Sequence, residues 1–173
     1  MTPGQVWGAT PAELDAQLPC DSMLSGTVTV CDRSIAVQAE PWLVFAWLCQ
    51  LRATPYSYDR IRNLGRPSPS DRDPALSELA VGQEFMGAFE LVDFTPDEHI
   101  TLLARPRVAV TYAVHRHELP GANAPVSTRL HVRVRFAGPR VIVIPVVFGD
   151  FIMMRKQLLT LKELAEREAR VVV

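Results

Sequence analysis

The densest group of side chains that could do chemistry is the run Tyr56-Ser57-Tyr58-Asp59. A phenol beside a carboxylate can orient a ligand carbonyl, or can act as a general acid and base. The same side chains also suit a structural role, in which Ser57 or Asp59 caps a short helix and Tyr58 packs on a sheet. Because helix caps are far commoner than catalytic dyads, we favour the structural role, and we keep Tyr58 and Asp59 as candidate polar contacts to a ligand.

A second group is rich in histidine. His115 and His117 lie on one face of a predicted strand, and His131 lies on the next strand, where the hairpin register decides whether it joins them. Three histidines can hold zinc with an open coordination position. Positive charge from Arg116 and Arg129 opposes a metal ion there. We therefore interpret the group as a solvated hairpin end, and we predict no metal and no cofactor.

Arginines form a third pattern, in which Arg129, Arg133 and Arg135 alternate with apolar residues and could meet phosphates or an anionic ligand. Alternation with a period of two is typical of a strand with one buried and one solvated face. We therefore favour a solvated outer face, whose charge Glu84 and Glu90 on adjacent strands would neutralise. The alternation predicts Arg129, His131, Arg133 and Arg135 outward, and Leu130, Val132, Val134 and Phe136 inward.

The elements that must position these groups include a long C-terminal helix, predicted over residues 148–170. One face of this helix carries apolar residues at alternating steps of three and four. These residues are Phe151, Met154, Leu158, Leu161 and Ala165. Asp150 is placed to cap the first turn. A broad apolar helix that follows strands indicates a helix laid across a sheet, an arrangement that often encloses a pocket.

The segments before this helix predict the rest of the fold. Residues 26–30 and 34–37 are rich in β-branched side chains, residues 42–49 form an apolar helix, and residues 58–64 form a second short helix. A strand over residues 84–91 starts a series of hairpins, because the apolar period becomes two. The order predicts an α+β fold, in which a curved antiparallel sheet wraps a long C-terminal helix and two short helices follow the first strand.

Composition limits the class of protein. The 173 residues, of which 48% are hydrophobic and 21% charged, fit one globular domain. The net charge of -1 argues against a general nucleic-acid binder. No apolar run approaches the roughly 20 residues that span a bilayer, and no secretory signal is evident, so we expect a cytoplasmic protein. We divide the chain into an N-terminal extension, residues 1–23, and a single ligand-binding domain, residues 24–173.

Several short motifs occur in a fixed order along the chain. They are Ile35-Ala36-Val37-Gln38-Ala39-Glu40-Pro41 followed by Trp42 and Trp47, Tyr56-Ser57-Tyr58-Asp59 with Asn63-Leu64, Val81-Gly82, Thr128-Arg129-Leu130, Gly149-Asp150-Phe151 with Arg155-Lys156, and Lys162 with Ala165-Glu166. In this order they resemble the helix-grip superfamily of START-like, Bet v 1-like and polyketide cyclase/lipid-transport proteins, nearest to an uncharacterised actinobacterial branch. The chain departs from that branch at Thr54-Pro55 and at Thr160-Leu161.

The resemblance implies a cavity between the sheet and the C-terminal helix that binds a hydrophobic small molecule, such as a lipid or polyketide, for transport or sequestration. It implies no established catalytic residues. We place Phe85 and Phe89 on one face of the strand over residues 84–91, toward this cavity. The expected wall and polar contacts are Tyr58, Asp59, Phe85, Phe89, Tyr112, Val132, Val134, Met154 and Leu158.

Two other functions stay open. A polyketide cyclase or dehydratase would need an acid or base inside the cavity, and the candidates are Asp59, Glu90, Tyr112 and His115. A protein-interaction module, which includes a homodimer, would instead use the loop over residues 67–74 or a dimer face. That module predicts a large exposed apolar patch and a filled interior.

Overall fold

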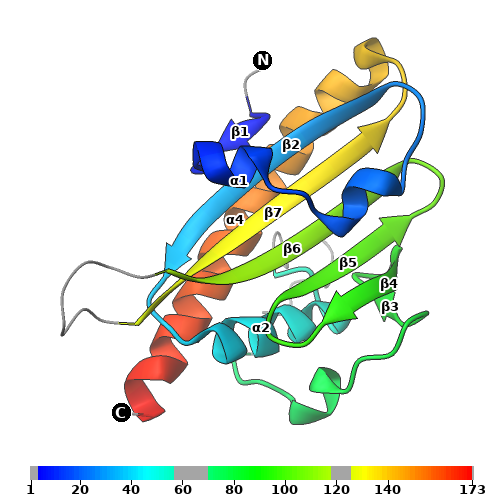
Figure 1. Ribbon diagram of the computed structural model, residues 1–173. Coiled ribbons are helices and arrows are strands. Elements are labelled where there is room, and N and C mark those ends of the chain that lie inside the picture. Colours follow the sequence, from blue (N-terminus) through cyan, green and yellow to red (C-terminus); the bar gives the residue numbers. More distant parts are fainter. Residues whose placement is uncertain (1–3, 57–69, 118–125, 173) are drawn as a thin grey trace.

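The computed structural model describes residues 4–56, 70–117 and 126–172. It is an α+β fold in which one sheet packs against a long C-terminal helix, a helix-grip-like arrangement (Figure 1). The strands are β1 (Val6–Trp7), β2 (Val28–Val37), β3 (Glu84–Phe85), β4 (Phe89–Thr95), β5 (His99–Ala104), β6 (Val108–His117) and β7 (Ser127–Ala137). The described helices are α1 (Pro11–Asp15), α2 (Pro41–Cys49) and α4 (Arg140–Val172), with short 3-10 turns η1 (Pro19–Ser22), η2 (Gln50–Arg52) and η3 (Pro74–Ser77).

The sheet runs in the order β1-β2-β7-β6-β5-β4-β3. All neighbours are antiparallel except β1, which pairs parallel to β2, so the sheet is mixed rather than purely antiparallel. The two segments predicted as β structure near residue 30 form the single strand β2, which pairs with β7 along its whole length. Of the two short helices expected after it, α2 is present, and residues 58–64 lie outside the described residues.

The prediction of a single strand over residues 84–91 is wrong. Met86 and Gly87 both have positive φ, and the Ala88 amide donates to the Phe85 carbonyl oxygen at 3.2 Å, so the chain turns back there. Positive φ at both central residues is the geometry of a tight hairpin turn. Phe85 and Phe89 are therefore cross-strand partners, one on β3 and one on β4.

Helix α2 is buried as its all-round apolar sequence predicts. Every residue from Leu43 to Cys49 is buried, and only its first turn, at Trp42, reaches solvent. It packs against α4 and the inner face of β6. The predicted inward residues of β7 (Leu130, Val132, Val134 and Phe136) all lie in the same core. The three cysteines are free and buried.

Helix α4 begins at Arg140, eight residues before the predicted start. Pro145 lies on the exposed side near the start of the helix, where it removes one backbone hydrogen bond. Val143 and Val147, on the other side, are buried and hold this first part against the sheet. No helix among the described residues combines the length and apolar character that crossing a bilayer requires.

Asp150 is consequently not the cap of a first turn. It lies inside α4, and its carboxylate accepts a 2.5 Å hydrogen bond from the Arg33 guanidinium of β2. Arg33 is fully buried on the inner face of the sheet and also donates to the Gly4 carbonyl oxygen. Burial raises the pKa of Asp150 above its ordinary value, although Arg33 opposes that shift. This ion pair joins the middle of α4 to the sheet.

Candidate functional site

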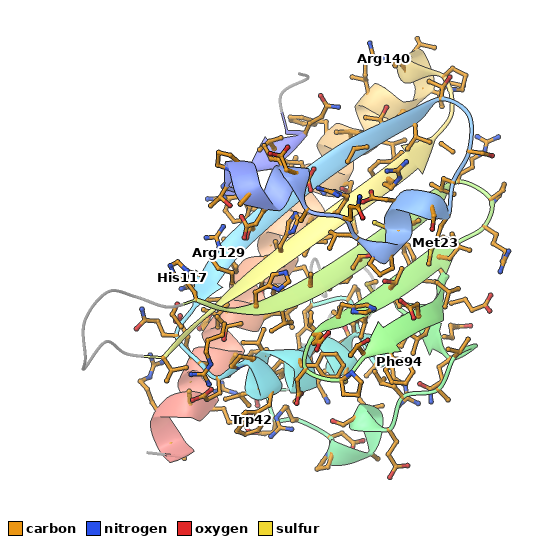
Figure 2. The ribbon with its side chains drawn as sticks, viewed as in Figure 1. Met23, Trp42, Phe94, His117, Arg129 and Arg140 are labelled. Carbon is orange, nitrogen blue, oxygen red and sulfur yellow. The ribbon has the colours of Figure 1, made fainter. Side chains whose placement is uncertain are left out.

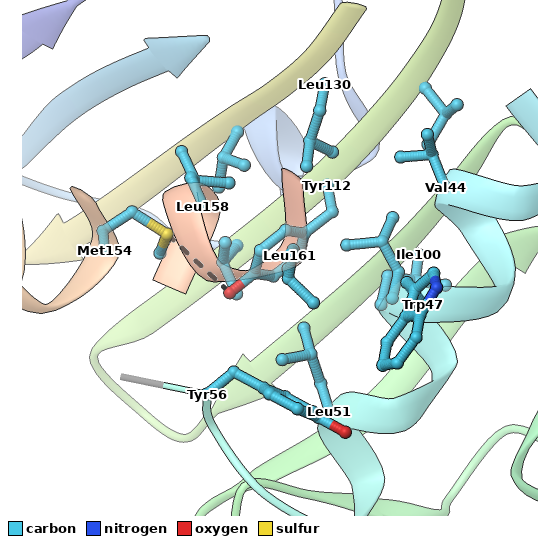
Figure 3. Packing of buried hydrophobic residues seen from close by; sticks show 14 of the residues in the cluster. Val44, Trp47, Leu51, Tyr56, Ile100, Tyr112, Leu130, Met154, Leu158 and Leu161 are labelled. Atoms are coloured by element: carbon cyan, nitrogen blue, oxygen red, sulfur yellow. Dashed lines mark hydrogen bonds between the residues drawn. The ribbon is translucent and has the colours of Figure 1, made fainter. Parts of the chain in front are cut away.

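The expected cavity wall lies in the interior, between the sheet and α4. Six of its members belong to one buried hydrophobic cluster, part of which Figure 3 shows, with Tyr112, Met154 and Leu158 labelled. Phe89 packs at the edge of that cluster. The six are Phe85, Tyr112, Val132, Val134, Met154 and Leu158. Tyr58 and Asp59 lie outside the described residues. The structure packs these side chains into the hydrophobic core, and none of them lines the pocket described below, so contact with a ligand stays a prediction for these residues.

One polar pair is embedded in this apolar interior. The Tyr112 hydroxyl donates to Gln157 Oε1 at 2.8 Å, and Gln157 Nε2 donates to the Pro55 carbonyl oxygen at 2.6 Å. The same hydroxyl lies 4.0 Å from the Met154 sulfur (Figure 3). Burial raises the pKa of Tyr112, so its phenol stays protonated and is a hydrogen-bond donor. Sequence analysis missed Gln157, although a glutamine between Met154 and Leu158 in the apolar stripe is a detectable signal.

An open pocket of about 830 Å³ lies farther along α4, where the end of β2 and the start of α2 meet the C-terminal third of the helix. Its apolar lining comes from three separate parts of the chain. The lining residues are Ala39, Trp42, Leu43, Val126 and Ala169. Trp42 is 45% exposed although the rest of α2 is buried (Figure 2). A large half-exposed aromatic side chain beside such a pocket is available to cover an apolar ligand.

The rim of this pocket is charged, and most of the charges already have partners. Lys162 donates to the Ala36 carbonyl oxygen at 2.6 Å and pairs with Glu166 at 2.8 Å. Glu166 also accepts from the Gln38 amide at 2.8 Å. Glu40 pairs with Arg116 at 2.6 Å. Arg170, in contrast, is exposed, and no ion pair or hydrogen bond joins its guanidinium to another described residue.

The opposite face of the sheet is not the solvated surface that the arginine pattern predicted. The N-terminal segment, residues 4–23, crosses this face in front of β2 and β7 (Figure 1). Arg133 is buried, and its guanidinium donates to Asp32 and Asp21 and to the carbonyl oxygens of Glu13 and Leu14. The neutralising acids are therefore on the N-terminal segment and β2, not Glu84 and Glu90. The error arose because strand alternation identifies the two faces but not what covers each.

Glu13 of α1 is the centre of the contacts that hold this segment in place. Its carboxylate accepts from Arg129 at 2.7 Å and from the Ser34 hydroxyl at 2.8 Å. It also completes a capping box with Thr10 at the start of α1. Burial alone would raise the pKa of Glu13, but the hydrogen bonds from Arg129, Thr10 and Ser34 outweigh it and lower the pKa to about 2.

The histidines do not form a metal site in the part of the chain that the structure describes. His131 is fully buried, and its Nε2 lies 2.9 Å from Asp32 Oδ1. His115 and His117 are exposed at the far end of β6. The interpretation as a solvated hairpin end fits these two, but His131 belongs to the covered network around Arg133.

The acid–base candidates for an enzyme are dispersed. Tyr112 points into the interior, His115 lies on the opposite face of β6, and Glu90 is an exposed residue of β4. Asp59 lies outside the described residues. The three described candidates do not face one common space, so they supply no acid–base pair.

Comparison with known proteins gives distant structural similarities only. No family model and no curated protein matches the chain. Similar solved structures include protein CV1439 from Chromobacterium violaceum, with 14% identity, 80% of this chain and 98% of that chain covered and a TM-score of 0.47. Protein MLL2253 from Mesorhizobium loti has 18% identity, 82% and 98% coverage and a TM-score of 0.44. CalU16 from Micromonospora echinospora has 13% identity, 86% and 90% coverage and a TM-score of 0.39. Similarity at this level carries no functional assignment.

Proposed function

We propose that the protein binds a hydrophobic small molecule, such as a lipid or polyketide, with its acidic end group at Arg170. The observation that carries this proposal is the pocket of about 830 Å³ at Trp42. Its volume lies within the range of roughly 300–1,000 Å³ that is typical of small-molecule sites. The resemblance to helix-grip proteins supports the same class of ligand, with transport or sequestration as the role.

The lining accounts for the apolar part of such a ligand. Trp42, Val126 and Ala169 present carbon surface that is partly exposed in the pocket. Burying apolar surface of protein and ligand contributes roughly 25 cal/mol for each Å² removed from water. A ligand that covers Trp42 therefore gains binding energy from surface that is otherwise left in water.

The rim accounts for the acidic end group. Lys162, Glu166 and Glu40 are already paired with protein groups, whereas the guanidinium of Arg170 is not. A guanidinium binds a carboxylate through two parallel hydrogen bonds, which gives both energy and orientation. The pocket therefore favours an acid over the corresponding alcohol.

Native mass spectrometry of the gently purified protein is the first test. The second is titration with dodecanoate and with dodecanol, with tryptophan fluorescence as the measure of binding. We expect dodecanoate to bind more tightly than dodecanol. Ala169→Trp, which fills the pocket, should abolish binding of both probes. Glu163→Trp, on the exposed side of the same helix, is the matched control and should bind both normally.

Charge reversal separates the two parts of the proposal. Arg170→Glu should weaken dodecanoate binding at least about tenfold, because repulsion replaces a charge-assisted hydrogen bond, and should leave dodecanol binding unchanged. An equal loss of affinity for dodecanoate and dodecanol would show that Arg170 does not bind the acidic end group. Normal binding of both probes to Ala169→Trp would show that this pocket is not the site.

A further inference from the structure

The first part of α4, from Arg140 to Met153, exposes an unusual number of apolar side chains. Seven of the thirteen large exposed hydrophobic side chains among the described residues lie in residues 141–153. They are Val141, Ile142, Ile144, Val146, Phe148, Ile152 and Met153. We call these seven residues the apolar face of α4. Val141 is 78% exposed and Phe148 58% exposed, so this face lies in water in the isolated chain.

The second half of the same helix shows that packing on the sheet does not require such a face. Ile142, Val146 and Met153 lie on one stripe that runs along the outer side of α4 at steps of three and four. Farther along, the same stripe carries polar and charged residues. These are Lys156, Thr160, Glu163 and Arg167. The helix is thus amphipathic in its second half and apolar on all sides over residues 141–149, a pattern that a solvent-exposed helix does not ordinarily have.

The exposed charges of α4 on either side of the apolar face are all positive. Exposed Arg140 precedes it (Figure 2), and exposed Arg155 and Lys156 follow it. The one acidic residue from Arg140 to Lys162 is Asp150, which points inward and is neutralised by Arg33. The partner of this face must therefore offer apolar surface together with negative charge.

A second copy of the chain does not meet that requirement. In an antiparallel pair of α4 helices, Arg140 of one copy would face Arg155 and Lys156 of the other. In a parallel pair each of these cations would face itself. Like charges directly opposite each other destabilise an interface, and no acid on this face offsets them. An anionic lipid bilayer offers both hydrocarbon and negative headgroups.

We propose that the apolar face of α4 docks the protein on an anionic membrane surface, with Phe148 and its neighbours in the acyl region and Arg140, Arg155 and Lys156 at the headgroups. The 13 residues from 141 to 153 extend about 20 Å along the helix axis, a length suited to a helix that lies in the plane of the interface. Apolar insertion and basic headgroup contacts are the two terms that bind such helices. This surface lies at the opposite end of α4 from the pocket at Arg170, so it does not depend on the proposed ligand site.

The test uses flotation of the full chain with vesicles of phosphatidylcholine alone and of phosphatidylcholine mixed with phosphatidylglycerol. We expect binding to the mixed vesicles, weakening as salt is raised because salt screens the headgroup contacts. Phe148→Asp should weaken it by at least about tenfold, since it places a charge in the inserted side. Val81→Asp, at another exposed apolar position, is the control and should bind as the unaltered chain does.

The basic residues are tested separately, by Arg140→Glu combined with Lys156→Glu. Each basic residue removed near an anionic surface costs about fivefold in binding, and reversal costs more, so the pair should lose at least about 25-fold. Circular dichroism checks that each variant is folded. Equal binding to neutral and anionic vesicles would overturn the proposal. Absence of binding to both kinds of vesicle would also overturn it, and would leave an acidic protein as the partner of this face. A dimer that sedimentation analysis detects and that Phe148→Asp dissociates would overturn it as well.

Discussion

At the scale of single residues, two carboxylates in this protein have opposite physical situations. Glu13 is stabilised as an anion by several donors, whereas Asp150 is held between a buried arginine and the apolar interior. Each carboxylate binds an arginine that is more than 100 residues away in the sequence: Glu13 binds Arg129, and Asp150 binds Arg33. Their contribution to stability can therefore be measured by replacing one side chain at a time.

Glu13 should make the free energy of unfolding depend on pH in the acidic range. Its pKa is about 2 in the folded chain and 4.5 without the fold, so the unfolded chain binds a proton first as the pH falls. The stabilisation is complete above pH 4.5, and it is lost as the pH falls toward 2. Because this carboxylate is only partly buried and solvent screens its ion pair, we expect a loss of about 1–2 kcal/mol in unfolding free energy from this group. Urea denaturation across that range measures it.

Glu13→Gln is the comparison for that titration. Its stability should fall less steeply with acid than that of the unaltered chain, because the group that titrates is gone. Asp21 also has a lowered pKa and contributes acid dependence to both proteins, so the difference between the two curves is the informative quantity. Identical curves would show that Glu13 does not hold the N-terminal segment electrostatically.

Asp150→Ala should destabilise the fold strongly. It leaves the guanidinium of Arg33 buried without its counter-ion, a change that costs about 3 kcal/mol or more in unfolding free energy. Arg116→Ala breaks the exposed pair with Glu40 and should cost less than about 1 kcal/mol. Urea midpoints of the two variants test the contrast. Equal midpoints would mean that the buried pair is no more important than the surface one.

At the scale of elements, the N-terminal segment is a cover for the outer face of the sheet. It supplies β1 to the sheet edge and α1 and η1 to the face. Beneath it lie the buried side chains of His131 and Arg133, and its Cys20 packs on Leu103 and Ala109 in a small apolar cluster. Removal of this segment would expose apolar surface and leave charged groups without partners.

Deletion of residues 1–23 should therefore lower the free energy of unfolding by at least about 3 kcal/mol, because hydrogen bonds to charged groups such as Arg133 contribute about 1.5–3 kcal/mol each. Calorimetry of the shortened chain measures the effect. Arg133→Met in the full chain removes the charge but keeps the cover, and it should cost less than the deletion. An unchanged melting temperature of the shortened chain would show that the segment does not stabilise the fold.

At the scale of the whole molecule, α4 carries two separate surfaces. Its C-terminal third borders the pocket with Lys162, Ala169 and Arg170, and its first part carries the apolar face with Phe148. The ion pair between Asp150 and Arg33 and the buried residues of the inner stripe hold the two surfaces in one rigid frame.

The two surfaces should fail independently. Ala169→Trp should lose dodecanoate binding and keep flotation with anionic vesicles, and Phe148→Asp should do the reverse, because neither residue contributes to the other surface. Running both assays on both variants checks this. Loss of both activities in either variant, with normal folding, would mean that pocket and apolar face form one site.

Local patterns alone determined much of the architecture. Period two along β7 predicted which residues face the core. The all-round apolar character of residues 42–49 predicted a buried helix, which is confirmed except at Trp42. The long C-terminal helix followed from its three- and four-residue steps. These predictions succeeded because the spacing of side chains along a helix or strand is a property of the backbone itself.

What lies opposite each face was decided only by the tertiary structure. Nothing near Arg133 in the chain shows that residues from Glu13 to Asp21 cover it, and nothing near Asp150 indicates Arg33. Trp42, Ala169 and Arg170 come together only when the end of β2 meets the end of α4. A periodic pattern states which side of an element is apolar, but the partner of that side depends on how the whole chain folds back on itself.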